Sequence, residues 1–259
     1  MERYQRIRAQ IDAGEVKALY VHLAEGTDER SRAELGGLIE IGLLTPATVI
    51  IHGTALTDDQ LEQVRDAGAK LVWSPQSNLR LYGQTTSAAH ALSLGIPVEL
   101  GADWLPSGSP SLLDELKVAR RTLRIQGTQV SSQHLVSMVT KDAARIAALD
   151  DFIGSLEPGR KADILVLERR REDPWENVVE ADPSWVELVT IGGNLIYGRP
   201  DWMEEFAVPG EAEHVLAWAK PMVLDTSYSV ALTASPAPRL AGLRAELIDR
   251  YPQVGPIFV

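Results

Sequence analysis

The first hundred residues contain four short apolar runs, separated by stretches in which apolar positions recur at helical spacing. The four runs are Lys17–Val21, Thr48–Ile51, Lys70–Trp73 and Ile96–Leu100. Continuous apolar character over four or five residues is typical of strands buried on both faces, as in parallel sheets. Between the runs, Asp58–Ala69 follows Thr57, which is a good helix N-cap, and Thr85–Leu94 ends at Gly95. The pattern predicts strands that alternate with helices.

This alternation predicts an α/β fold with a parallel sheet. Units of roughly 30 residues fit a β/α barrel, but a doubly wound sheet has the same rhythm. The periodicity alone therefore leaves both architectures open. Two further helices are expected at Leu112–Leu123 and Gln133–Leu149, where apolar positions again lie on one side.

After Gly154 the rhythm is replaced by a β pattern. Ala162–Leu167 is expected to be a strand, and Trp185–Ile191 and Leu195–Tyr197 flank a glycine-rich turn, as in an antiparallel hairpin. We expect three segments: residues 1–152 as a partial β/α barrel, 153–200 as a small β module, and 201–259 as a helical and proline-containing extension. The extension includes a predicted helix at Leu240–Tyr251, and His214 is also expected in a helix.

Composition narrows the possible functions. The chain has no cysteine, which excludes disulfides, thiolate metal sites and a cysteine nucleophile. Its formal net charge of −11 disfavours binding to nucleic acid. It has no apolar run of roughly the 20 residues that a membrane span needs, and residues 1–10 do not resemble a signal peptide. We expect a cytoplasmic protein that acts on a small molecule.

Polar and chemically active residues follow each predicted strand. The candidates are His22 and Glu25, then His52, then Asn78, then Asp103 and Trp104. In β/α folds the carboxyl ends of the strands meet at one edge, where active sites form. Four such ends in succession predict a site there. His90 and His134 lie in helical stretches, and with His214 they are interpreted as surface residues.

The chemistry of this set suits metal-assisted hydrolysis. Imidazole and carboxylate groups are ligands for zinc or ferrous iron, and a glutamate beside such a site can transfer a proton to a leaving group. Catalytic zinc usually takes three protein ligands and a water. His22 and Asp103 supply two ligands, with His52 as a possible third. The set therefore falls short of a complete metal site.

These segments resemble the amidohydrolase superfamily. The resemblance rests on YVHLAEG, VIIHGTALT, WSPQSNLRLYGQTT, VELGADWLPSGSPSLLDELKVA and GSLEPGRKADILVLE, in the order of the family, over about two-thirds of the chain. It is nearest to the cytosine deaminase-like and triazine chlorohydrolase-like branch. It implies a (β/α)₈ barrel, here about strands 5 to 8, followed by a small β-sandwich module, with one Zn²⁺ or Fe²⁺ at the barrel mouth.

The resemblance also implies roles for individual residues. His22 corresponds to a metal-ligand histidine, and Glu25 to the glutamate that transfers protons. His52 corresponds to a histidine that orients the substrate, and Asp103 to an aspartate that holds the metal or its water. Asn78 and Trp104 lie in loops that line the substrate site in such proteins. The implied activity is hydrolysis of C–N or C–Cl bonds in a small heterocycle or amide.

The chain departs from the family pattern because no His-x-His pair occurs in it. We therefore expect the isolated chain to be inactive, and to associate with itself or with a companion N-terminal half, since half a barrel exposes strand edges. Two other functions stay open: a non-catalytic small-molecule-binding remnant, and a structural subunit that completes a barrel supplied by another chain.

Overall fold

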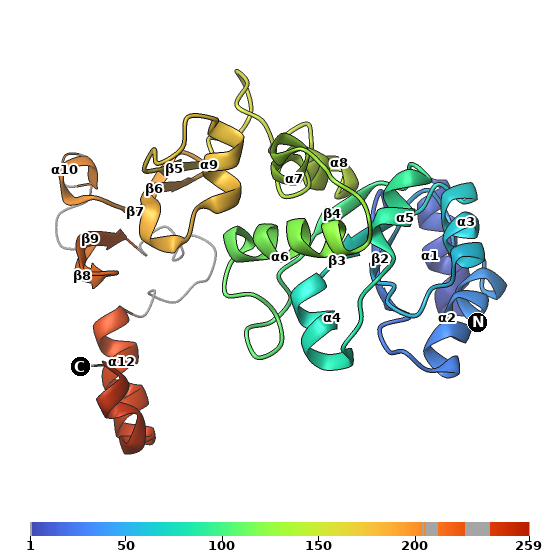
Figure 1. Ribbon diagram of the computed structural model, residues 1–259, viewed down its shortest axis with the longest axis horizontal. Coiled ribbons are helices and arrows are strands. Elements are labelled where there is room, and N and C mark those ends of the chain that lie inside the picture. The colour runs from blue at the N-terminus through green and yellow to red at the C-terminus, as the bar shows by residue number, and fades with distance from the viewer. Residues whose placement is uncertain (1, 204, 206–211, 226–238, 259) are drawn as a thin grey trace. The chain divides into compact units, whose positions relative to one another are not determined.

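The computed structural model describes residues 2–203, 205, 212–225 and 239–258 (Figure 1). The residues form two compact units. The first consists of Met1–Arg160 and Arg169–Pro183, and the second of Lys161–Glu168 and Ser184–Val259. These boundaries differ from those of the three predicted segments, because residues 169–183 return to the first unit and residues from 184 onwards share the second.

The first unit contains a parallel sheet of four strands in the order β1-β2-β3-β4. The strands are β1 (Leu19–Leu23), β2 (Thr48–His52), β3 (Lys70–Trp73) and β4 (Val98–Leu100). Each strand lies beside the next one in the sequence, with no reversal of the order. A doubly wound sheet reverses its strand order at a switch point, whereas a β/α barrel does not. The α/β fold with a parallel sheet is thus confirmed, and the strand order is that of a barrel segment.

The sheet is strongly curved, as a hydrogen bond between its two edge strands shows. Tyr20 on β1 donates its hydroxyl to Oε1 of Glu99 on β4, at 3.1 Å. In a flat sheet these edge strands would lie about 14 Å apart, at about 4.8 Å per strand spacing. Their side chains can meet only if the sheet curls. The face that carries Tyr20 and Glu99 is therefore the concave one, and His22 shares it, two residues after Tyr20.

Helices of the first unit pack against the opposite, convex face (Figure 1). Those in this core are α1 (Glu2–Asp12), α2 (Glu29–Glu40), α3 (Asp58–Asp66), α5 (Ala88–Ser93), α6 (Leu112–Ile125), α7 (Ser132–Ser137) and α9 (Pro174–Glu180). The unit also contains α4 (Pro75–Tyr82) and α8 (Lys141–Ile146). The predicted N-cap of α3 is confirmed: Thr57 accepts from the Gln60 amide, and the Gln60 side chain accepts from the Thr57 amide. This capping box satisfies two amides that the helix leaves unpaired.

The single helix predicted at Gln133–Leu149 is wrong, because the structure has α7 and α8 there, with a break at Thr140. Thr140 leaves the helical region with φ −133° and ψ −98° and becomes the N-cap of α8. The two helices pack in different hydrophobic cores. Met138, at the end of α7, packs in the convex-face core, whereas Ile146 packs with Val49 and Val72 on the concave face. One straight helix cannot reach both faces of a sheet.

The second unit contains an antiparallel sheet in the order β5-β6-β7-β9-β8. Its strands are β5 (Ile164–Leu167), β6 (Val186–Ile191), β7 (Asn194–Gly198), β8 (Ala212–Ala217) and β9 (Lys220–Asp225), with the short helices η1 (Pro183–Trp185), α10 (Pro200–Met203), α12 (Leu240–Arg250) and η2 (Pro252–Phe258). The predicted hairpin is confirmed as β6 and β7. The β8–β9 hairpin was not predicted, and His214 lies on β8, so its assignment to a helix is wrong. The sandwich implied by the resemblance stays a prediction.

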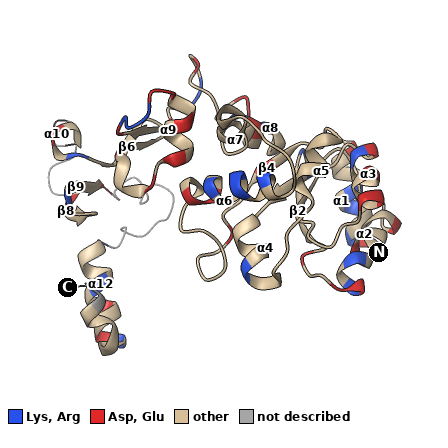
Figure 2. Cartoon of the chain, in the orientation of Figure 1, with Lys and Arg blue, Asp and Glu red and all other residues tan. Residues whose placement is uncertain are grey.

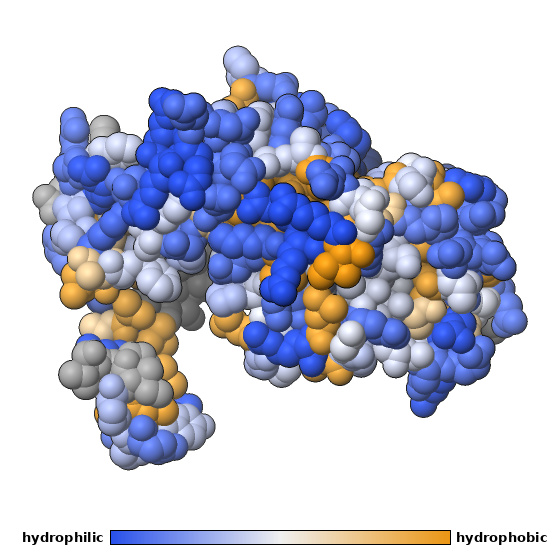
Figure 3. Space-filling view, in the orientation of Figure 1, coloured by the Kyte–Doolittle hydropathy of each residue, from blue (hydrophilic) through white to orange (hydrophobic). Residues whose placement is uncertain are grey.

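The predicted C-terminal helix is confirmed as α12, and part of its surface is apolar. Leu240, Leu243 and Leu247 recur at helical spacing and are each at least 40% exposed, and apolar residues gather along this helix in Figure 3. Among the described residues, no helix combines the length and apolar character needed to cross a bilayer.

Candidate functional site

Three residues at the carboxyl ends of strands have left-handed backbone conformations. Ala24 follows β1 with φ 53°, His52 ends β2 with φ 73°, and Asp103 lies beyond β4 with φ 59°. For residues other than glycine this conformation costs roughly 1–3 kcal/mol, and such residues cluster at functional sites. The surroundings hold them in place: Glu34 accepts from the Ala24 amide at 2.7 Å, and Thr86 donates to the His52 carbonyl at 2.6 Å.

His52 lies at the centre of the candidate site. Its side chain is 2% exposed, and its ring centroid lies 5.5 Å from that of His22 on the neighbouring strand. Its Nδ1 lies 3.1 Å from Nδ2 of Asn78, and its Nε2 lies 3.6 Å from Oε2 of Glu25. The structure therefore brings together four of the six predicted residues: His22, Glu25, His52 and Asn78.

Glu25 occupies the exposed side of this cluster. Tyr82, at the end of α4, donates its hydroxyl to Oε1 of Glu25 at 3.1 Å. The other carboxylate oxygen faces His52, at a distance too long for a direct hydrogen bond. The Glu25 side chain is about one-third exposed, so that one oxygen is fixed while the carboxylate stays open to solvent. A carboxylate in this position can accept and return a proton.

Asp103 is held from the other side by α4. The Ser77 hydroxyl donates to Oδ2 of Asp103, and the Ser107 hydroxyl lies 3.2 Å from that of Ser77. Both serines are buried, whereas Asp103 itself is exposed. Trp104 is 67% exposed, and its predicted contact with a substrate stays a prediction.

Burial determines the charge state of His52. Removal from water lowers its pKa, with a smaller contribution from His22, and this outweighs the opposite influence of the Glu25 and Asp103 carboxylates. His52 is therefore neutral at physiological pH. Burial also raises the pKa of the Tyr82 hydroxyl, with the Glu25 charge acting in the same direction. Tyr82 thus stays protonated and remains a hydrogen-bond donor to Glu25.

Sequence reasoning missed the helix that organises much of this site. α4 supplies Ser77, Asn78 and Tyr82, and was expected only as a loop. Two local signals could have revealed it: Pro75 at the first turn, where proline suits a helix, and Gly83 at the C-cap with φ 70°.

The cluster does not form a metal centre by itself. Among the residues that the structure describes, no group of three or more histidine, aspartate or glutamate side chains is placed to hold a metal ion. His22, His52 and Asp103 have the right ligand chemistry, but catalytic zinc usually needs three protein ligands around one point. The residues present therefore do not fit a complete zinc or iron site.

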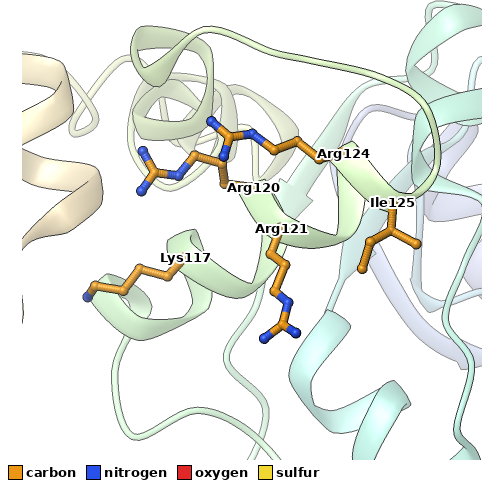
Figure 4. Close-up of a pocket in the computed structure, with 5 residues that line it drawn as sticks. All are labelled: Lys117, Arg120, Arg121, Arg124 and Ile125. Carbon is orange, nitrogen blue, oxygen red and sulfur yellow. The ribbon is translucent and has the colours of Figure 1, made fainter.

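A separate hollow lies on α6, away from the strand ends. It has a volume of about 560 Å³ and is lined by Lys117, Arg120, Arg121, Arg124 and Ile125 (Figure 4). The basic residues of α6 are the blue bands along this helix in Figure 2. Lys117 already donates to two backbone carbonyls, and Arg120 pairs with Glu176 at 2.6 Å. Since all five lining residues come from one helix, we interpret this feature as a solvated basic face.

Residues 2–196 match the sequence model of the Amidohydrolase family. The chain belongs to the amidohydrolase family. The resemblance found in its motifs is thereby confirmed. Similar curated proteins include a 5-methylthioadenosine/S-adenosylhomocysteine deaminase of Syntrophus aciditrophicus, 29% identical over 69% of this chain and 44% of that protein. Another is a 5'-deoxyadenosine deaminase of Methanothermobacter thermautotrophicus, 28% identical over 77% of this chain and 51% of that protein. This amidohydrolase chain spans about half the length of these relatives.

Solved structures support the fold of this amidohydrolase. A zinc-bound adenosine deaminase from Xanthomonas campestris superposes with a TM-score of 0.66 at 21% identity, over 74% of this chain and 48% of that one. A zinc-bound atrazine chlorohydrolase from Arthrobacter aurescens gives 0.60 at 23% identity, over 73% and 46%. At such identities the likeness establishes the fold alone.

Proposed function

We propose that this chain carries the acid–base part of a hydrolase site that cleaves a C–N or C–Cl bond in a small heterocycle or amide. The observation that carries the proposal is the convergence of Glu25 and neutral His52 beside His22 at the strand ends. The relatives support the same class, since those reported above are named as deaminases or a chlorohydrolase.

Hydrolytic deamination needs a proton carrier, and Glu25 is placed to be one. Water adds its oxygen to the carbon, the C–N bond breaks, and the departing nitrogen takes a proton. Glu25 accepts the proton from water and delivers it to the leaving nitrogen, so no net proton is consumed at the carboxylate. The hydrogen bond from Tyr82 fixes the orientation of this carboxylate.

The proposal includes a metal ion for which this chain supplies only part of the ligands. The two solved neighbours reported above contain zinc, and the chemistry of His22 and Asp103 suits Zn²⁺ or Fe²⁺. Because the described residues do not complete a metal site, we assign these two residues as partial ligands only.

A companion surface is part of the same proposal. On the concave face Tyr20 is 42% exposed and His22 is also exposed, although both lie on an inward-facing position of a curved sheet. We propose that a second copy or a companion N-terminal half covers this face and supplies the remaining metal ligands. A cytoplasmic location stays a prediction of the sequence.

One observation favours a second candidate function. The described residues lack a complete metal-binding group, which is what a non-catalytic small-molecule-binding remnant would show. In such a remnant, or in a purely structural subunit, Glu25 would have no catalytic role. The two candidates therefore differ in whether Glu25 matters for turnover.

The experiment joins this chain to the N-terminal half of the Syntrophus deaminase and measures ammonia released from 5'-methylthioadenosine. Glu25→Gln should lower turnover by about 10²- to 10⁴-fold, as expected for loss of a general acid–base group. Glu29→Gln is the matched control, because Glu29 is exposed at the start of α2, where it pairs with Arg32 one helical turn away. Turnover that is equal in the Glu25→Gln chimera and its parent would remove Glu25 from the reaction, and the proposal with it.

A further inference from the structure

A chain of hydrogen bonds runs from the core of the first unit to the ring of His52. The indole Nε1 of Trp73 donates to Oγ1 of Thr85 at 2.8 Å, and the Thr85 hydroxyl donates to Oδ1 of Asn78 at 3.0 Å. The Asn78 amide nitrogen then lies 3.1 Å from Nδ1 of His52. Trp73, Asn78 and His52 are each at most 2% exposed and Thr85 is half-buried, so the bond between Asn78 and His52 is shielded from water.

Trp73, the first residue of this hydrogen-bond relay, sets the direction in which its hydrogen bonds are donated. An indole N–H can only donate, so Thr85 must accept from Trp73. The hydroxyl proton of Thr85 is then free to donate, and the acceptor beside it is the Asn78 side chain. If the Asn78 amide were reversed, it would offer N–H groups to Thr85, and the hydroxyl proton would lose its acceptor on Asn78. Full satisfaction of the donors therefore places the Asn78 carbonyl toward Thr85 and its NH₂ toward His52.

The orientation of the Asn78 amide determines the tautomer of His52. Since Asn78 donates to Nδ1, that nitrogen must be the acceptor of a neutral imidazole, and the single ring proton must reside on Nε2. Nε2 is the nitrogen that faces Glu25. We propose that Trp73, Thr85 and Asn78 are positioning residues that fix His52 as the Nε2–H tautomer, so that it presents a hydrogen-bond donor to the site.

This assignment specifies what His52 recognises. A fixed N–H beside Glu25 binds a hydrogen-bond acceptor, such as a ring nitrogen or a carbonyl oxygen of the substrate, and does not act as a proton acceptor. That role in the reaction rests on the proposed function, whereas the tautomer itself does not. Asn78, which the sequence suggested as a substrate contact, is here assigned to the Nδ1 side of the His52 ring.

The tautomer is measured directly by long-range ¹H–¹⁵N correlation NMR on the full chain labelled with ¹⁵N-histidine, at pH 8. The signals of His52 are identified by their loss in His52→Gln, among the five histidines. In the unmodified chain Nε2–H should exceed Nδ1–H by about tenfold, which corresponds to one hydrogen bond of about 1.4 kcal/mol. In Asn78→Asp the ratio should invert, because a carboxylate can only accept and draws the proton to Nδ1.

Two further variants separate positioning from simple structural damage. Thr85→Val removes the hydrogen bond that orients the Asn78 amide. The ratio of Nε2–H to Nδ1–H should then fall toward an equal mixture of the two tautomers. Thr85→Ser is the matched control, because it keeps the hydroxyl that accepts from Trp73 and donates to Asn78, so the tautomer should stay unchanged. Circular dichroism verifies that each variant folds.

A proton on Nδ1 in the unmodified chain, or an unchanged tautomer in folded Asn78→Asp, would overturn the proposal. The NMR result does not depend on turnover. If the tautomer inverts in Asn78→Asp while the Syntrophus chimera shows no dependence on Glu25, the relay stands and the proposed hydrolase function fails.

Discussion

Glu99 on the concave face should make the stability of the first unit depend on pH. Its side chain is 7% exposed, and its hydrogen bond from Tyr20 joins the two edge strands of the sheet. Burial raises the pKa of Glu99 from 4.5 to about 7, against the opposing influence of the Tyr20 hydrogen bond. The perturbation that tests this is Glu99→Gln, which keeps an oxygen to accept from Tyr20 but cannot ionise.

The size and sign of the effect follow from proton linkage. Between pH 4.5 and about 7 the unfolded chain has released the proton while the folded chain keeps it. The free energy of unfolding of the parent is therefore largest below pH 4.5 and falls as the pH rises through 7. A pKa difference of about 2.5 units, at about 1.36 kcal/mol per unit, gives a loss on the order of 3 kcal/mol. The free energy of unfolding of Glu99→Gln should not show this decrease, because glutamine does not ionise.

Urea denaturation followed by tryptophan fluorescence, at intervals between pH 4 and pH 8, measures the effect. The two proteins should be about equally stable at pH 4, and the variant should gain up to about 3 kcal/mol by pH 8. Glu62→Gln is the control, because Glu62 is 54% exposed on α3 and should change stability by less than about 0.5 kcal/mol at any pH. A stability difference between Glu99→Gln and its parent that is constant across this range would refute the argument.

Two further predictions concern the core and the assembly. Leu71→Ala should lower the free energy of unfolding by about 2–5 kcal/mol, because Leu71 is fully buried on the convex face. Ile39→Ala is the control: Ile39 is 43% exposed, so its loss should lower the free energy of unfolding far less in the same urea assay. The purified chain should bind zinc weakly and associate with itself, measured by elemental analysis after dialysis and by light scattering. A uniform monomer that retains one tightly bound zinc would contradict this second prediction.

The strands and their polar ends could be predicted from the sequence because their signals are local. A run such as Thr48–Ile51 is apolar at each position but the first, which already requires burial on both faces, and His52 follows it directly. The capping box at Thr57 and the β6–β7 hairpin were equally readable, since each depends on residues a few positions apart. The family followed from these same segments.

Other features depended on residues that are distant in the sequence, and only the tertiary structure decided them. The bond between Tyr20 and Glu99 spans 79 positions and exists because the sheet curls. Tyr82 reaches Glu25 across 57 positions, and Asn78 reaches the ring of His52 across 26. Local pattern gives the type of each side chain and its place on an element, but not its partner. The partner is fixed by packing, which minimises buried unpaired polar groups over the whole fold, and the direction of the His52 relay is a consequence of that requirement.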